Sequence, residues 1–221
     1  MADLKDPHRN TNGINGHLSN DHTTPPPSSP NAWSTPGSAA FDFRSDTVTT
    51  PTASMLAATQ NCTLLDDVFR EDPTTLSLES HIASLTGKDA ALFVISGTLG
   101  NQLSVRTHLG GPPHSILADA RSHVIAWEAG GIATLSGAMP IPVTPSNNHH
   151  LTLTDIRTHA ILDTDNHFAP TRLLSLENTL GGTILPLSDC RSIATWARKQ
   201  DPPIKLHLDG ARLWEACDDV F

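Results

Sequence analysis

Short apolar runs alternate with amphipathic stretches from about residue 90 to the end of the chain. The runs are ALFVIS (91–96), HSILAD (114–119), MPIPV (139–143), RLLSLEN (172–178) and KLHLDG (205–210). Continuous apolar runs of this length are typical of strands that are buried on both faces of a parallel sheet. The two prolines of MPIPV lack an N–H donor, so we place this strand near an edge of the sheet.

The stretches between these runs have helical spacing of their apolar residues. They are TLGNQLSVRTHLGG (98–111), HVIAWEAGGIATLSG (123–137, a helix and a short crossover), LTLTDIRTHAI (151–161) and LSDCRSIATWARKQ (187–200). In the last of them, Ile193, Trp196 and Ala197 fall on one face. Repeated strand–helix–strand units imply a three-layer α/β fold with a mostly parallel sheet covered by helices on both faces.

The part of the chain before residue 90 is organised differently. Residues 1–40 are rich in proline, serine and threonine, which predicts a disordered tail, and residues 41–221 form the predicted domain. Asp72 followed by Pro73 has the pattern of an N-cap and first helical residue. We expect this helix to end at Gly87.

Composition and charge narrow the class of protein. The net charge of -9 argues against a nucleic-acid-binding surface. There is no apolar run of 18 residues and no secretory signal, so we expect no membrane segment and a cytoplasmic location. The three cysteines, Cys62, Cys190 and Cys217, are widely spaced and odd in number, which fits a reducing compartment, and we expect them to be small buried apolar residues.

Polar residues follow most of the predicted strands. They are Ser96-Gly97-Thr98, Asp119 to His123, Glu177-Asn178-Thr179 and Asp209 to Arg212. In open parallel sheets, ligands bind beyond the carboxyl ends of the strands, so we expect these residues to share one site. The turn Ser96-Gly97-Thr98 opens a helix, whose free N–H groups attract an anion such as a phosphate. The alternative is an ordinary strand–helix turn in which Thr98 is the N-cap.

Asp209 ends a strand that we predict to be buried, where a carboxylate needs a positive partner. The simple interpretation is an ion pair with Arg212. The functional interpretation is that Asp209 faces a protonated ring nitrogen of a cofactor and so keeps that ring an electron sink. We favour the second interpretation because a phosphate-binding turn is predicted at the same edge of the sheet.

Several histidines are candidates for proton transfer. His123 follows the second predicted strand and can stack on an aromatic cofactor or move a proton, and His167 is a second candidate. We interpret His207 as a hydrogen-bonded core residue. His149 and His150 have no evident third metal ligand, so we expect no metal site there.

Six blocks of the sequence occur in the order found in a known family. They are FRSDTVTTPT, FREDPTTLSLE, FVISGTLGNQ, ADARSHVIAWEAGG, HFAPTRLLSLENT and HLDGARLWEA. Together, over residues 41 to 217, they resemble the L-threonine aldolases of the aromatic amino acid β-eliminating lyase/threonine aldolase group, which are pyridoxal phosphate enzymes of fold type I. The resemblance implies the large domain of that fold, and a homo-oligomer, either a dimer or a tetramer.

The resemblance also implies roles for individual residues. It implies a phosphate site at Ser96, Gly97 and Thr98, stacking of His123 on the ring, Asp209 as partner of the ring nitrogen, contacts of Arg212 and Ser45 to the substrate carboxylate or the cofactor, and His167 near the substrate hydroxyl. The implied reaction cleaves L-threonine or a related β-hydroxy-α-amino acid to glycine and an aldehyde, with His123, or His167 through a water, as the base. A pyridoxal phosphate-dependent alanine racemase of the same family is one alternative. A non-catalytic truncated paralogue or subunit is another.

Three departures from the family pattern are visible. Arg70 stands where a glycine is usual, and Leu180 stands where many members have a histidine. The lysine that binds the cofactor covalently lies beyond the Asp-Gly-Ala-Arg block in the family, and Lys5, Lys88, Lys199 and Lys205 do not match its context. We therefore expect a domain that lacks its C-terminal part, exposes a sheet edge and an apolar face, and is inactive on its own.

Overall fold

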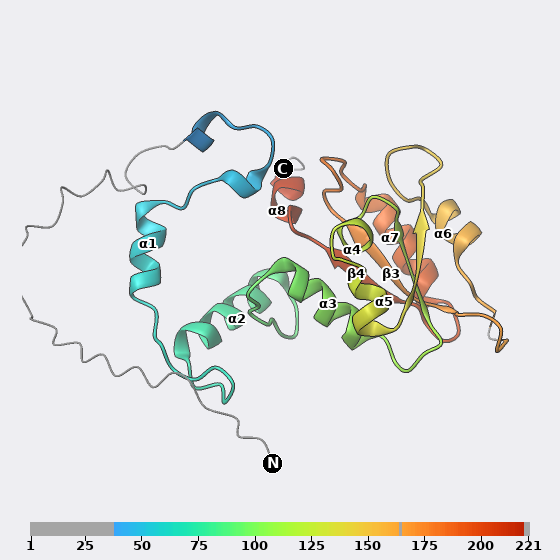
Figure 1. The fold of residues 1–221 in the computed structure, drawn as a ribbon, viewed down its shortest axis with the longest axis horizontal. Helices are drawn as coiled ribbons and strands as arrows, with labels where there is room; N and C mark the ends of the chain where they lie inside the picture. Colours follow the sequence, from blue (N-terminus) through green and yellow to red (C-terminus); the bar gives the residue numbers. More distant parts are fainter. Residues whose placement is uncertain (1–37, 164, 219–221) are drawn as a thin grey trace, which may run out of the picture. The chain divides into compact units, whose positions relative to one another are not determined.

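The computed structural model describes residues 38–163 and 165–218. The chain divides into two units, residues 1–77 and residues 78–221. The predicted tail, residues 1–40, lies almost entirely outside the described residues. Figure 1 gives the order of the elements along the chain.

A parallel sheet of four strands is the centre of the second unit. The strands are β1 (Ser115–Asp119), β2 (Met139–Val143), β3 (Thr171–Glu177) and β4 (Lys205–Asp209). Their order across the sheet is β2-β1-β3-β4, and every neighbouring pair is parallel. The prediction that the proline-containing strand lies at an edge is confirmed, because β2 is the first strand in this order.

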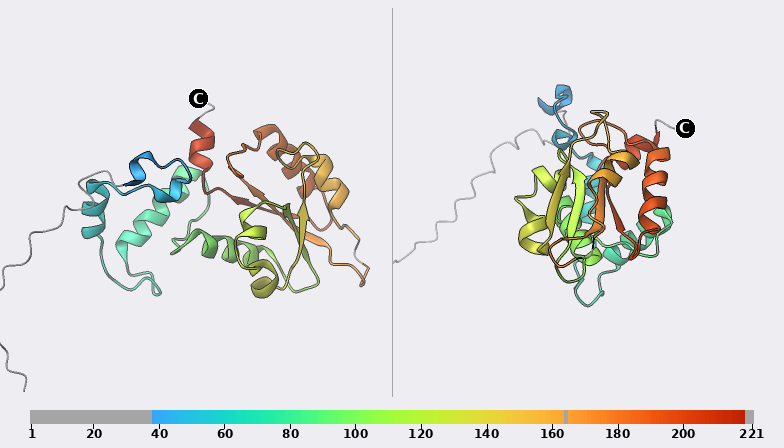
Figure 2. Two further views of the ribbon diagram at one scale, coloured as in Figure 1. Left: turned by 45° about the horizontal axis from the view of Figure 1, so that its top comes forward. Right: turned by 90° about the vertical axis from the view of Figure 1, so that its right-hand side faces the viewer.

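Helices cover both faces of this sheet, so the predicted three-layer α/β architecture is confirmed (Figure 2). On one face lie α3 (Gly97–His108), α4 (His123–Ala126) and α5 (Gly131–Ser136); on the other lie α6 (Leu153–His159) and α7 (Leu187–Arg198). A further short helix, α8 (Leu213–Asp218), follows β4 and was not predicted from the sequence.

The core has one apolar cluster on each side of the sheet. Successive residues of a strand point to opposite faces, so Ile116 and Leu173 pack beneath α3 and α5, while Leu117 and Leu174 pack beneath α6 and α7. Ile193 and Ala197 are buried in the second cluster and Trp196 packs against it, as the helical spacing predicted. Each fully buried leucine or isoleucine side chain contributes about 2 kcal/mol when it is removed from water.

The prediction of a strand over residues 91–96 is wrong. This segment has no strand conformation, and Ile95 is 88% exposed. A strand needs neighbours whose backbone groups pair with its own. Among the described residues, the only N–H group of this segment with a hydrogen bond is that of Phe93, which donates to Glu79 Oε1 at 2.9 Å. The apolar run is therefore present without the sheet partner that would make it a strand.

The first unit contains two 3-10 helices, η1 (Ser38–Phe41) and η2 (Asp46–Val48), the helix α1 (Ala53–Gln60) and the start of α2 (Pro73–Thr86). The predicted start of α2 is confirmed. Asp72 Oδ1 accepts the N–H of Thr75 at 2.8 Å, and Asp72 Oδ2 accepts that of Leu65 at 3.0 Å. These two donors lower the pKa of Asp72 to about 2. Gly87, with φ of +62°, follows the end of α2 as predicted.

Arg70 adopts the left-handed backbone conformation, with φ of +58°. This region favours glycine, because a side chain there costs about 1–2 kcal/mol. The chain therefore keeps the turn that a glycine would make at this position, with an arginine in it.

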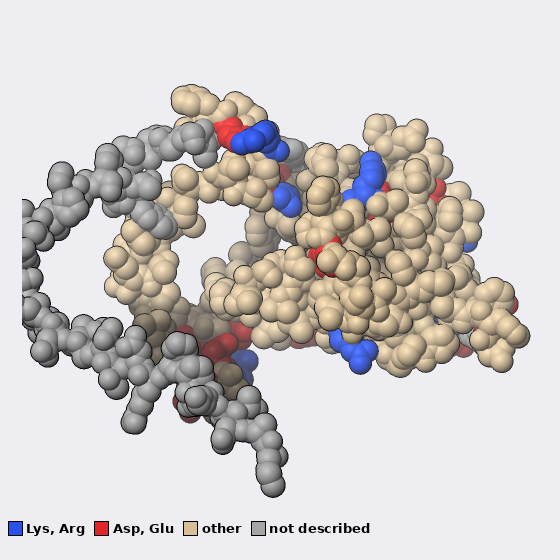
Figure 3. All heavy atoms as spheres, viewed as in Figure 1, with Lys and Arg blue, Asp and Glu red and all other residues tan. Residues whose placement is uncertain are grey.

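The cysteines are free, and only one of them is partly buried. Cys62 and Cys217 are exposed, so the prediction that all three are buried is wrong for these two. Cys190 packs against the core, and burial raises the pKa of its thiol. A helix long and apolar enough to cross a membrane does not occur within residues 38–163 and 165–218. Figure 3 shows the lysine and arginine side chains (blue) and the aspartate and glutamate side chains (red) on one face of the described residues.

Candidate active site

Three carboxylates end neighbouring strands of the sheet, namely Asp119 on β1, Glu177 on β3 and Asp209 on β4. Because the strands are parallel, all three lie at the same edge of the sheet. Glu177 and Asp209 are direct partners in the register of β3 and β4. The structure therefore brings together three of the four polar sets that the sequence placed at one site.

A partly buried hydrogen-bonded cluster lies at this edge and connects His123 with Asp209. Asn101 Nδ2 donates to Glu128 Oε1 and to Asp209 Oδ2, both at 2.8 Å. His123 Nδ1 lies 2.8 Å from the same Oε1 atom of Glu128. A ring nitrogen of His123 and one carboxylate oxygen each of Glu128 and Asp209 all lie within 4.8 Å of one another. We call His123, Glu128, Asn101 and Asp209 the carboxylate–histidine cluster.

The side chain of Glu128 is fully buried, and three donors surround it. Besides Asn101 and His123, Gln102 Nε2 donates to its second oxygen, Oε2. A buried carboxylate is tolerated only when such donors replace its water. The short loop after Glu128 is held close to the cluster, since a Cβ at Gly131 would lie 2.7 Å from the amide of Gln102. Any larger residue than glycine at 131 would displace that amide.

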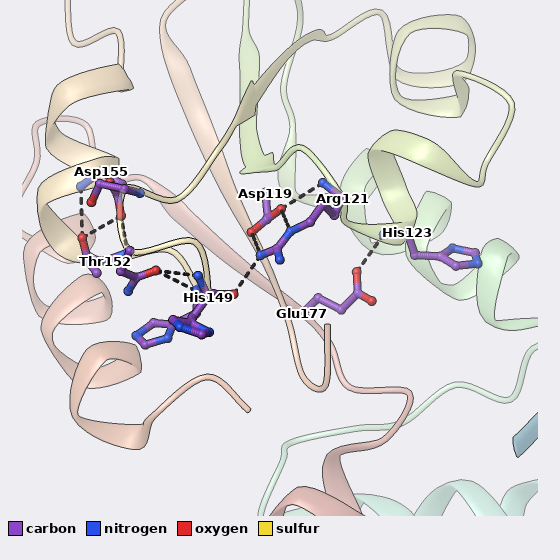
Figure 4. A network of polar contacts seen from close by, with 10 residues as sticks. Asp119, Arg121, His123, His149, Thr152, Asp155 and Glu177 are labelled. Carbon is purple, nitrogen blue, oxygen red and sulfur yellow. Dashed lines mark hydrogen bonds and ion pairs between the residues drawn. The ribbon is translucent and has the colours of Figure 1, made fainter. Parts of the chain in front are cut away.

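Glu177 holds the start of α4 in place. Its Oε2 accepts the backbone N–H of His123 at 2.7 Å, while the His123 ring points away from it (Figure 4). Burial raises the pKa of Glu177, the N–H of His123 acts against this rise, and the neighbouring charge of Asp209 adds to it.

The first turns of α3 lie beside the carboxylate–histidine cluster, because Asn101 of α3 belongs to it. Ser96 is the N-cap, and its Oγ accepts the N–H of Leu99 at 3.1 Å, so the alternative in which Thr98 is the cap is wrong. Ser96, Gly97 and Thr98 are exposed, and the helix N–H groups that follow can receive an anion. Asn101, about one turn further along α3, makes the contact to Asp209. One helix therefore connects the predicted phosphate turn to the end of β4.

Asp119 has a different set of partners beside the cluster (Figure 4). Its carboxylate accepts two hydrogen bonds from the guanidinium of Arg121, at 3.0 and 2.8 Å, and Arg121 also donates to the carbonyl of His149 at 2.8 Å. His150 Nε2 lies 2.8 Å from Asp189 Oδ2. These contacts fix the loop before α6 against the end of β1 on one side and against the start of α7 on the other.

The remaining candidate residues are placed elsewhere. His167 is 84% exposed in the loop that precedes β3, at the opposite end of that strand from Glu177, and pairs with Asp165. The structure does not bring His167 to His123 within this chain. His207 is buried and hydrogen-bonds Ser175 Oγ at 2.9 Å, as expected for a core residue. Ser45 caps η2 in the first unit.

Arg212 lies just beyond β4, where its charge is near enough to lower the pKa of Glu177. Its backbone N–H lies 3.4 Å from the carbonyl of Asn178, so the ends of β3 and β4 are tied together beyond the sheet. The Asp209 carboxylate accepts hydrogen bonds from Asn101 and from the N–H of Ala211 at 3.2 Å.

Comparison with known proteins assigns the chain to a family. The sequence model of the family described as "Beta-eliminating lyase" matches residues 42–220. The chain belongs to the beta-eliminating lyase family. This match covers both units of the chain and includes every element that contributes to the carboxylate–histidine cluster.

The curated proteins that the chain resembles include fungal proteins with named activities. The chain is 61% identical to "Aldolase vrtJ" of Penicillium aethiopicum over 83% of its length, and 52% identical to "Low specificity L-threonine aldolase" of Saccharomyces cerevisiae over 80%. It is 48% identical to "Alanine racemase TOXG" of Cochliobolus carbonum over 84%. These alignments cover 47%, 46% and 47% of the relatives, so the chain spans about half the length of the curated relatives it matches.

Solved structures show the same fold. The threonine aldolase of Leishmania major superposes with a TM-score of 0.63 at 23% identity, over 74% of this chain and 47% of that one. A putative L-allo-threonine aldolase of Listeria monocytogenes gives a TM-score of 0.55 at 26% identity, over 72% of this chain and 43% of that one. The fold is therefore the α/β fold of the threonine aldolases, fold type I of the pyridoxal phosphate enzymes.

Two residues of the carboxylate–histidine cluster, Glu128 and Asn101, were missed by sequence reasoning, and so was Gln102, which donates to Glu128. Glu128 had a signal that could have revealed it, since it is the only charged residue in the stretch HVIAWEAGG. Asn101 and Gln102 gave a weaker signal, as two adjacent amides in a helix that otherwise packs on the sheet. Their partners are 27 and 26 residues away, and the contact to Asp209 spans 108 residues.

Proposed function

We propose that this chain forms the large-domain part of a pyridoxal phosphate-dependent aldolase, which cleaves L-threonine or a related β-hydroxy-α-amino acid to glycine and an aldehyde. The observation that carries the proposal is the hydrogen bond from Asn101 to Asp209. It links the helix with the anion-binding start to the carboxylate suited to a protonated ring nitrogen. The relatives named threonine aldolase support the choice of reaction.

The residues present fit pyridoxal phosphate. The Ser96-Gly97-Thr98 turn is exposed and opens a helix of twelve residues, which suits the phosphate. Asp209 is half-buried, and its described hydrogen bonds come from the neutral donors Asn101 and Ala211, so its charge suits a protonated ring nitrogen. When bound, the cofactor supplies an electron sink for the pair of electrons left by bond cleavage.

We assign the remaining steps to side chains of this chain. His123 would lie against the cofactor ring and would accept the proton of the substrate hydroxyl through Nε2, since its Nδ1 faces Glu128. The Cα–Cβ bond then breaks, the aldehyde leaves, and return of a proton to Cα completes glycine. Arg212, just beyond the end of β4, binds the substrate carboxylate, and the roles that the family resemblance implies for Ser45 and His167 remain predictions.

The described lysines do not lie with the cluster. Lys205 begins β4, at the opposite end of that strand from Asp209, Lys199 follows α7, and Lys88 follows α2. We therefore propose that the residues of this chain hold the cofactor through its phosphate and ring nitrogen. Borohydride treatment tests this proposal, because a cofactor fixed to any of these lysines by reduction would contradict it.

The reaction is tested on purified protein that is expressed from the complete gene. With pyridoxal phosphate and L-threonine, acetaldehyde release is followed by coupled reduction with alcohol dehydrogenase and NADH. Asp209→Ala is expected to abolish release and to weaken cofactor binding, which is measured by absorbance titration. Asp89→Ala, an exposed carboxylate outside the site, is the matched control. Release that is unaffected by Asp209→Ala would contradict the proposal.

A second candidate is an alanine racemase, which the relative of that name favours. Both reactions would use the same cluster and differ in which bond to Cα breaks. L-Alanine is therefore included in the same assay, with chiral chromatography of the product. D-Alanine without acetaldehyde would replace the aldolase by the racemase. Neither product, with cofactor bound, would favour a non-catalytic subunit.

We further propose that the protein acts in the cytoplasm as a homo-oligomer, a dimer or a tetramer, on a small amino-acid substrate. The acidic net charge of -9 supports a partner other than nucleic acid. Light scattering of the purified protein measures its oligomeric state, and a monomer would contradict this part of the proposal.

A further inference from the structure

We propose that Glu128 is a positioning residue that holds the His123 ring in the tautomer with its proton on Nδ1, so that Nε2 remains a proton acceptor. This inference rests on the proposed function only where it concerns turnover. The tautomer itself is a property of this chain without cofactor or substrate.

The contact between His123 and Glu128 determines where the ring proton lies. The two atoms, Nδ1 and Oε1, are 2.8 Å apart. An ionised carboxylate can only accept hydrogen bonds, so Nδ1 must donate. In a neutral imidazole only one nitrogen carries a proton, which leaves Nε2 with its lone pair.

The neighbours of Glu128 keep it an acceptor. Asn101 donates both of its amide hydrogens to carboxylates, one to Glu128 and one to Asp209. Reversing this amide would place its oxygen against two carboxylates, so its orientation is fixed by its partners. Gln102 donates to the other oxygen of Glu128. With donors on both of its oxygens and no exposed surface, Glu128 is held as the ionised acceptor.

The backbone of His123 is held as well as its ring. Glu177 accepts the N–H of His123 at 2.7 Å, which fixes the first residue of α4. The His123 side chain is 39% exposed, so a substrate can reach the ring while Nδ1 stays bound to Glu128. In the His123 ring, Nδ1 is therefore hydrogen-bonded to Glu128, and Nε2 is available to accept a proton from a substrate.

Nitrogen NMR on protein with labelled histidine tests the tautomer directly. The spectrum is recorded at pH 8 without cofactor, and the His123 signals are assigned by their loss in His123→Asn. We expect the shifts of a protonated Nδ1 and an unprotonated Nε2. A ring with its proton mainly on Nε2, or with both nitrogens protonated at this pH, would overturn the proposal.

Two variants of Glu128 separate the hydrogen bond from simple packing. Glu128→Gln keeps one oxygen, which can still accept the hydrogen bond from Nδ1 of His123. The new N–H groups then face Gln102, whose buried Oε1 has no described hydrogen-bond partner and can accept from them when the Gln102 amide turns. We expect it to keep the tautomer. Glu128→Leu removes the acceptor and is expected to give a mixture of both tautomers. An unchanged tautomer in folded Glu128→Leu would overturn the proposal, and so would a changed one in Glu128→Gln.

Turnover provides the second measurement. If His123 is the base, Glu128→Leu lowers kcat by about 100-fold, the lower end of the range for general acid–base catalysis, with little change in KM. Glu128→Gln stays close to the native kcat. Absence of aldolase and racemase activity in the native protein would refute the proposed function, while the NMR result would still decide the tautomer. An equal loss of kcat in both variants would overturn the positioning role.

Discussion

β3 and the segment 91–96 are both apolar runs, but only β3 forms a strand of the sheet. β3 lies between β1 and β4, and its residue Leu174 has no exposed surface. In the segment 91–96, Ile95 is 88% exposed and no strand pairs with the backbone among the described residues. Apolar composition is shared by the two runs, so it does not account for the difference. What β3 has in addition is a hydrogen-bonded neighbour on each side and a helix layer on each face.

The sharpest test of this comparison removes one large side chain from each run. Leu174→Ala is expected to lower the free energy of unfolding by about 3 kcal/mol, because it leaves a cavity in a closed core. Ile95→Ala is expected to change it by less than about 0.5 kcal/mol, as at other exposed positions. Urea unfolding followed by circular dichroism measures both. Similar losses would show that residues 91–96 are packed in solution.

Outside the sheet, local backbone preference should matter more than neighbours, and Arg70 tests this. Its left-handed conformation predicts that Arg70→Gly is more stable than Arg70→Ala by about 1 kcal/mol. Both variants lose the arginine side chain, so their difference isolates the backbone. Equal unfolding free energies would show that the turn relaxes without cost.

The junction between the segment 91–96 and α3 should be stabilised by its cap. Ser96→Ala is expected to cost about 1 kcal/mol because the N–H of Leu99 loses its acceptor. Ser96→Gly should cost only about a few tenths of a kcal/mol. Thermal unfolding of the two variants, compared with the native protein, gives the ranking, and a reversed ranking would contradict the role of the cap.

The smallest effect concerns pH and His207, which lies on β4 beside β3. Burial lowers the pKa of His207, so the unfolded chain binds a proton at a higher pH than the folded one. Stability should therefore fall as pH drops from 7 through about 6.5, the ordinary value, towards the lowered folded value. Glu177, whose pKa is raised, contributes with the opposite sign, losing stability as pH rises through its folded pKa. The difference between native and His207→Gln isolates the histidine; a pH-independent difference would contradict this assignment.

Much of the fold could be predicted from the sequence because its signals are local. Asp72-Pro73 determined a helix start, and the prolines of MPIPV indicated an edge strand. A strand at 91–96 would have to pair with another part of the chain, and the spacing of apolar residues does not predict such pairing. The short helix α8 and the free, exposed Cys62 were missed for a similar reason, since burial depends on what packs nearby.

The candidate site was predicted in part. Asp209, His123 and the turn at Ser96 were found because each follows an apolar run, and the parallel sheet brings such positions to one edge. Asn101 and Glu128, which connect them, lie inside a helix and a loop and have no positional signal of this kind. The roles of Ser45, Arg212 and His167 remain predictions.

The helix α3 carries both the N–H groups at its start and, about one turn later, the amide that contacts Asp209. Three residues of helix rise by about 4.5 Å, and this rise is rigid. A ligand that binds the start of α3 with one end and Asp209 with the other would therefore have to match a fixed distance between these two contacts. Length, and not charge alone, would decide what fits there.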